Sequence, residues 1–141
     1  MGTRSYIGRQ YSDGSVRAVY CHWDGYPENN GRLLVSHWDD DDKLECLLDE
    51  GDLSSLGEKL GKKHDFNKCP EGVCNFYGRD RGEEGVEART HADLGEFLVA
   101  AGGASADFAY LRESGRWLCW SLGGDPVEVD ISSRNSALWG S

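Results

Sequence analysis

The chain has 141 residues, with 15 basic and 25 acidic side chains and a formal net charge of −10. This length suits one domain, and five Trp, six Tyr and four Phe exclude a disordered chain, because aromatic side chains bury large areas. No apolar run approaches the roughly 20 residues that span a bilayer. The negative charge repels nucleic acid. We therefore expect a single domain over residues 1–141, with neither a membrane nor a nucleic acid as a direct partner.

Two features of the sequence point to a reducing, cytoplasmic compartment. The N-terminal residues lack the apolar stretch of a signal peptide. The five cysteines, an odd number, do not match the framework of a small secreted disulfide-bonded protein. Cys46 and Cys119 lie among apolar residues and are predicted to be core thiols.

In chain order, the first predicted element is an antiparallel hairpin. The turn sequence Asp13-Gly14 lies between two β-rich runs, residues 5–11 and 15–23, and Asp-Gly is a strong hairpin signal. Residues 24–31 are rich in turn-forming types and are predicted to form a loop. The N-terminal part of the chain is therefore expected to supply two paired strands.

Two helices are predicted next. Apolar and aromatic residues at helical spacing indicate the first, over residues 33–38. In the run that follows, Asp39 or Asp40 is expected to cap the second helix, and Asp41 and Asp42 to favour the positive end of its dipole. That helix ends at Gly51 and presents a leucine face, formed by Leu44, Leu47 and Leu48. The alternative is a calcium loop, but the run lacks the alternating ligand spacing and the glycine of an EF-hand. A further expectation is that the four carboxylates form an acidic surface that mimics nucleic acid or docks on a basic partner.

The second half of the chain alternates loops with short elements. Residues 57–72 are predicted to form a long polar loop, residues 73–77 a short strand, and residues 78–85 a charged, glycine-rich loop. Thr90 with Asp93 resembles a capping box at the start of a helix. Leu94, Phe97, Leu98 and Ala101 give this helix its spacing, and Gly102-Gly103 ends it.

A second hairpin is predicted between residues 108–112 and 116–122. In a regular strand Trp117 and Trp120 fall on opposite faces, so one is expected in the core and the other more exposed. The tail 132–141 is expected at the periphery. The order of elements predicts an α+β fold in which two to three helices pack on an antiparallel sheet, made from the two hairpins and the short middle strand.

The first candidate site is the sequence Cys21-His22-Trp23-Asp24-Gly25-Tyr26-Pro27 at a strand end. Its aromatic and polar side chains suit a ligand held by stacking and a few directed hydrogen bonds, which makes His22, Trp23, Asp24 and Tyr26 candidate binding residues. His22 and Asp24 also share a strand face, as a general acid–base pair must. Neither a nucleophile motif nor a phosphate-binding loop accompanies them. The alternative is an ordinary turn with packed aromatic residues.

The second candidate site is Tyr77-Gly78-Arg79-Asp80-Arg81-Gly82. Arg79 and Arg81 would point the same way in an extended loop and could clamp a phosphate or a carboxylate, with Tyr77 stacking on a base. The alternative is local ion pairing with Asp80 and the neighbouring glutamates.

A zinc site from His64, Cys69 and Cys74 is a third hypothesis, since imidazole and thiolate are zinc ligands. The spacing is not that of a standard zinc motif, and the alternative is a polar loop with two incidental thiols. We assign no metal and no cofactor to the chain.

The segments MGTRSYIG, DGSVRAVYCHWDGYP, FYGRDRGEEGVEAR and FAYLRESGRWLCW resemble a family of small proteins encoded by bacteriophages and prophages. The resemblance covers roughly residues 1–122, and CHWDGYP and YGRDRGE are its most specific parts. It brings no catalytic residue with it. It implies a protein made in the cytoplasm of a bacterial host that acts by binding.

Three functions follow as expectations. The first is a phage accessory protein that inhibits a host defence or regulatory factor by direct protein binding, through Asp39, Asp40, Asp41 and Asp42 or through the aromatic loop around Trp23 and Tyr26. The second is an oligomer that sequesters a nucleotide signal with Arg79 and Arg81. The third is a small hydrolase or metal enzyme that uses His22 and Asp24.

Overall fold

The computed structural model describes residues 3–122 and 128–131. The tail 132–141, for which the sequence predicts a peripheral position, lies outside the described residues. Three α-helices are present in the described part of the chain: α1 (Arg32–His37), α2 (Asp41–Asp49) and α3 (Leu94–Gly103). A π-helical turn, η1 (Pro27–Gly31), precedes α1, and a 3-10 turn, η2 (Phe66–Lys68), lies in the long polar loop. None of the described helices is long and apolar enough to cross a membrane.

Both predicted hairpins are present. The first consists of β1 (Ser5–Gln10) and β2 (Val16–Cys21), and the second of β6 (Phe108–Glu113) and β7 (Arg116–Ser121). The shorter strands are β3 (Leu53–Ser55), β4 (Asn75–Phe76), β5 (Arg89–His91) and β8 (Glu128–Asp130). One sheet has the order β4-β3-β2-β1-β6-β7-β8, and β5 pairs with the first half of β2.

The α+β class is as predicted, but the expectation of a purely antiparallel sheet is wrong. The two hairpins join through β1 and β6, which run parallel, with Ser5 opposite Phe108. β2 and β3 are also parallel. Since β5 is antiparallel to β2, it runs in the same direction as β6, and α3 carries the chain from one to the other. A helical crossover of this kind is what parallel strands require, and it makes the sheet mixed.

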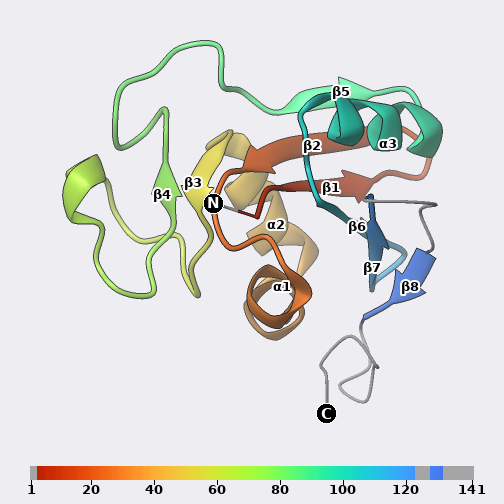
Figure 1. The fold of residues 1–141 in the computed structure, drawn as a ribbon, viewed down its shortest axis with the longest axis horizontal. Coiled ribbons are helices and arrows are strands. Elements are labelled where there is room, and N and C mark those ends of the chain that lie inside the picture. Colours follow the sequence, from red (N-terminus) through yellow and green to blue (C-terminus); the bar gives the residue numbers. More distant parts are fainter. Residues whose placement is uncertain (1–2, 123–127, 132–141) are drawn as a thin grey trace.

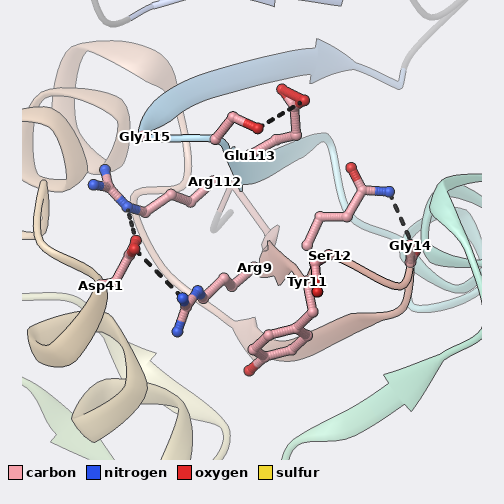
Figure 2. A pocket seen from close by; sticks show the side chains of 10 residues that line it. Arg9, Tyr11, Ser12, Gly14, Asp41, Arg112, Glu113 and Gly115 are labelled. Carbon is pink, nitrogen blue, oxygen red and sulfur yellow. Dashed lines mark hydrogen bonds and ion pairs between the residues drawn. The ribbon is translucent and has the colours of Figure 1, made fainter.

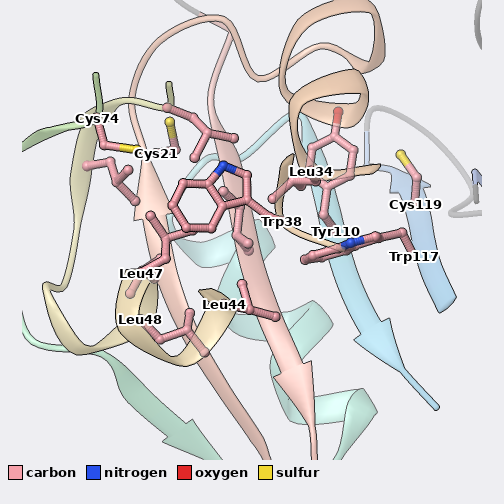
Figure 3. Close-up of a cluster of buried hydrophobic side chains, with 14 of the residues drawn as sticks. Cys21, Leu34, Trp38, Leu44, Leu47, Leu48, Cys74, Tyr110, Trp117 and Cys119 are labelled. Carbon is pink, nitrogen blue, oxygen red and sulfur yellow. The ribbon is translucent and has the colours of Figure 1, made fainter. Parts of the chain in front are cut away.

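Helices cover both faces of the sheet (Figure 1). α1 and α2 pack on one face over the larger core, part of which is drawn in Figure 3: Leu34, Trp38, Leu44, Leu47, Leu48, Tyr110 and Trp117. α3 packs on the other face, where Phe97 and Ala101 meet strand residues such as Val16 and Trp120. Trp117 and Trp120 do lie on opposite faces, but both are buried because each face has its own helical cover.

The ends of the helices follow local capping chemistry. The carboxylate of Asp40 accepts a hydrogen bond from the backbone N–H of Lys43 and so caps α2, as one of the two predicted residues. At α3 the cap is Asp93, whose carboxylate accepts from the N–H of Glu96. Thr90, the predicted start of that capping box, instead lies in β5 and pairs with Arg17.

Candidate functional site

The loop after β2 carries two large, exposed aromatic side chains. Trp23 is 44% exposed and Tyr26 is 38% exposed, and among the described residues Val99 on α3 is the other large hydrophobic side chain left in solvent. Exposed Trp and Tyr are enriched among the residues that dominate binding energy at protein interfaces. The loop therefore presents side chains of the type that partners recognise.

The backbone of the same loop is held firmly in place. The N–H of Gly25 donates to the carbonyl oxygen of Thr3 (2.8 Å), and the buried hydroxyl of Tyr110 donates to the carbonyl oxygen of Gly25 (2.6 Å). The N–H of Trp23 donates to Ser54 of β3 (2.9 Å). Behind the loop, the buried amide of Asn30 donates to the hydroxyl of Ser5 and to the thiol of Cys21. The backbone of the loop is thus ordered by these hydrogen bonds, although its rings face solvent.

His22 is oriented by its aromatic neighbours and not by Asp24. Its Nδ1 lies 2.8 Å from the hydroxyl of Tyr20, and its ring is perpendicular to that of Trp23 at a centroid distance of 4.7 Å. Asp24 is exposed, adopts a left-handed backbone conformation (φ 56°) and uses its carbonyl oxygen to accept from Asn29. The structure shows no hydrogen bond between His22 and Asp24, so the acid–base pair needed by the hydrolase hypothesis is not assembled here.

Arg79 is tied into the fold by its whole guanidinium group. Its five N–H groups donate to the carboxylate of Asp80 and to the carbonyl oxygens of Leu60, Gly61 and Cys74. Asp80 has a fully buried side chain and also accepts from the N–H of Phe76 (2.8 Å). Because a guanidinium has five donors in total, Arg79 has none left for a phosphate.

Arg81 does not share the partners of Arg79, because residues 77–81 form turns and not the extended loop that would align the two arginines. Its guanidinium lies over the rings of Phe66 (5.0 Å) and Tyr77 (5.8 Å) and pairs with Glu83. The expected two-arginine clamp is therefore not formed. Arg81 itself is exposed, and its guanidinium stacks on these two aromatic rings.

The two sequence motifs lie on either side of the same short strand. His22 and Trp23 donate their backbone N–H groups to Leu53 and Ser54 of β3, while Tyr77 donates to Asp52, the residue that precedes β3. CHWDGYP and YGRDRGE are therefore neighbours in the sheet, even though they are some 50 residues apart in the sequence. Their aromatic rings form two separate groups, Tyr20–His22–Trp23 and Phe66–Tyr77.

The acidic run is largely engaged with the sheet. Arg112 of β6 donates to Asp39 and to Asp41, and Arg9 of β1 pairs with Asp41. Figure 2 shows the side chains of both arginines converging on Asp41. Asp40 caps α2, which leaves Asp42 as the member of the run whose side chain has no hydrogen bond or ion pair among the described residues. Three of the four carboxylates thus have intramolecular partners, and the run does not form a free row of charges.

A hollow of about 580 Å³ lies between the turns of the two hairpins. Figure 2 draws the side chains that line it. Arg9 and Arg112 line it, but each guanidinium already has two carboxylate partners, because Arg9 also pairs with Glu45. The turn residues Ser12, Ser114 and Gly115 supply the opposite walls. With its cations engaged inside the molecule, this hollow has little to attract an anion.

The residues of the zinc hypothesis have other partners. Nε2 of His64 lies 2.9 Å from the side-chain oxygen of Asn75, and Cys74 is buried, where desolvation raises the pKa of its thiol to about 12. Over the residues described, no group of three or more His, Cys, Asp or Glu side chains is placed to hold a metal ion.

Cys119 is buried as predicted, whereas the prediction for Cys46 is wrong, because this thiol is exposed on α2.

A second hollow, of about 650 Å³, was not indicated by the sequence. One wall consists of Asp24, Asn29 and Leu33, and the other walls of the segments 55–58 and 69–73. We refer to it as the 24–73 groove. Three separate segments come together in it, so local sequence patterns carry no signal for it. It shares Asp24 with the aromatic loop.

Comparisons with protein-family models, with curated proteins and with solved structures found no match to this chain.

Proposed function

We propose that this protein is a non-enzymatic binding protein that attaches to a partner protein through the exposed rings of Trp23 and Tyr26. Following the resemblance to phage-encoded proteins, we further propose that it works in the cytoplasm of a bacterial host, where the partner is a defence or regulatory factor that it inhibits. The observation that carries the proposal is the contrast within one loop between exposed aromatic rings and a backbone fixed at Gly25, Trp23 and Asn30.

Such an arrangement favours binding for an energetic reason. Ordering a flexible loop on association opposes binding, and a loop that is already ordered avoids much of this cost. Trp and Tyr bury large areas while losing few rotatable bonds, so they contribute strongly when a partner covers them. In the free protein, by contrast, exposed aromatic rings gain little for the fold.

The acidic run has a smaller part in this proposal than the sequence suggests. Asp39, Asp40 and Asp41 are engaged with Arg112, with the N-terminus of α2 and with Arg9. The overall charge of −10 still steers the protein toward basic partners, because long-range attraction raises the rate of encounter.

The test is a capture experiment with immobilised protein and bacterial lysate. The parent is compared with the double variant Trp23→Ala/Tyr26→Ala and with the control Val99→Ala, which removes the exposed hydrophobic side chain of α3. We expect proteins that the parent and the control retain and the double variant loses. Equal retention by all three proteins, or retention by none, would contradict the proposal.

A further inference from the structure

The 24–73 groove lies next to the aromatic loop and has a one-sided charge. Three exposed carboxylates line it, those of Asp24, Glu58 and Glu71, and among the described residues no Lys, Arg or His lines it. None of these three carboxylates is in an ion pair within the part of the chain that is described. This distinguishes the groove from the hollow between the hairpin turns, whose charges neutralise one another.

Apolar residues also line the groove. Leu56 is buried, and Leu33 and Val73 are partly buried, so the lining of the groove combines aliphatic surface with carboxylates. The side chains of Lys and Arg are complementary to this lining, because each has an aliphatic stem that ends in a positive charge. Such a side chain can lay its stem on the apolar surface and bring its charge to a carboxylate.

The spacing of the carboxylates argues against a single ion. In the described structure they do not form a group that could share one metal ion. Separate carboxylates suit separate cations, and an extended peptide supplies these at intervals of about 7 Å on one side of its backbone. Phosphates of a nucleic acid would meet three unpaired carboxylates and the field of a chain with a net charge of −10.

We propose that the 24–73 groove binds an extended segment of the partner protein that is rich in Lys and Arg. This inference rests on the proposed function, and it adds the chemistry of the partner. Asp24 joins the two surfaces, because it follows Trp23 in the loop and also lines the groove. Cations of the same segment that extend past the groove would meet the exposed faces of Trp23 and Tyr26, which attract positive charge.

The test measures binding of a short fluorescent peptide that alternates arginine and alanine, by anisotropy at low salt. The groove variant Asp24→Asn/Glu58→Gln/Glu71→Gln removes three charges without changing side-chain size. A matched control, Asp42→Asn/Glu84→Gln/Glu87→Gln, removes three exposed charges that do not line the groove. We expect the groove variant to weaken binding about tenfold or more, and the control to weaken it less than about threefold.

Three outcomes would overturn the inference: no binding of the arginine peptide by the parent, an equal loss in both triple variants, or stronger binding of a glutamate version of the peptide or of a DNA oligonucleotide. The variants are checked by circular dichroism and urea unfolding. If the groove triple variant fails to fold, Glu58→Gln and Glu71→Gln are measured singly, and each is expected to weaken binding about twofold or more.

The failure of this inference can be told apart from the failure of the proposed function. If lysate proteins are lost from Trp23→Ala/Tyr26→Ala but retained by the groove variant, the aromatic surface binds a partner and the groove does not. If the groove variant loses the peptide while Trp23→Ala/Tyr26→Ala retains every captured protein, the groove binds basic segments and the aromatic loop is not the docking surface.

Discussion

The acidic run at residues 39–42 and the aromatic loop at residues 22–26 are both conspicuous in the sequence, yet the fold uses them in opposite ways. In the acidic run the side chains are engaged with the molecule, through Arg9, Arg112 and the N-terminus of α2. In the aromatic loop the backbone is engaged and the largest side chains are left in solvent. A surface for a partner is better indicated by unused side chains on an ordered backbone than by the density of charge alone.

The largest expected effect on stability comes from disturbing the backbone of the aromatic loop. In Gly25→Ala the new Cβ would lie 2.8 Å from Cβ of Ser5 and 2.9 Å from the carbonyl oxygen of Thr3. The loop must then move and weaken the hydrogen bond from Tyr110, so we expect the free energy of unfolding to fall by about 2–3 kcal/mol. Urea denaturation measures this change. A variant as stable as the parent would mean that the loop is not fixed as described.

A smaller effect on stability is expected from the acidic run, and the matched variants Asp41→Asn and Asp42→Asn isolate it. Asp41 contacts both Arg9 and Arg112, whereas its neighbour Asp42 is exposed without either contact. Asp41 and Asp42 both lie in the first turn of α2, where a carboxylate interacts favourably with the helix dipole, so that contribution is common to both variants. Because Asp41 alone contacts the two arginines, Asp41→Asn should lower the free energy of unfolding by about 1 kcal/mol more than Asp42→Asn does. If the two variants lose equal stability, the run acts through its overall charge and the difference drawn between its members is wrong.

The same pair of variants has a predicted pH dependence. The hydrogen bond from Arg112 lowers the pKa of Asp41 from its ordinary value of 3.8, and the charge of Arg9 acts in the same direction. A carboxyl whose pKa is lower in the folded state stabilises the fold above its ordinary pKa, and this contribution is lost as the pH falls through the folded-state value. The stability difference between the parent and Asp41→Asn should therefore shrink when the pH is lowered from 6 to below about 3.8. A difference that is constant over this range would contradict the assignment.

The parts of the fold that the sequence predicts are those with local causes. Both hairpins have a two- or three-residue turn signal, and the leucine spacing of α2 reflects contacts one turn apart. That same spacing places Cys46 on the opposite side of α2 from Leu44 and Leu48. The helical period therefore predicts that the thiol is exposed, as it is, whereas its apolar neighbours in the sequence suggested burial.

The parts that the sequence does not predict depend on pairings between distant residues. β3 and β5 have three residues each and exist because Leu53 and His91 meet β2. The parallel pairing of β1 with β6 joins residues about 100 positions apart. In the candidate site, the aromatic loop has a local signal, whereas the engagement of Arg79 depends on carbonyl groups of a loop that precedes it by 18 to 19 residues.

The most direct test of the central claim is the unfolding free energy of Trp23→Ala/Tyr26→Ala, measured by urea denaturation beside the parent. If these rings serve a partner and are not needed by the fold, the value will lie within about 0.5 kcal/mol of the parent, as for exposed side chains in general. A loss of about 2 kcal/mol or more would contradict that claim, because the rings would then be part of the packing that holds the loop in place.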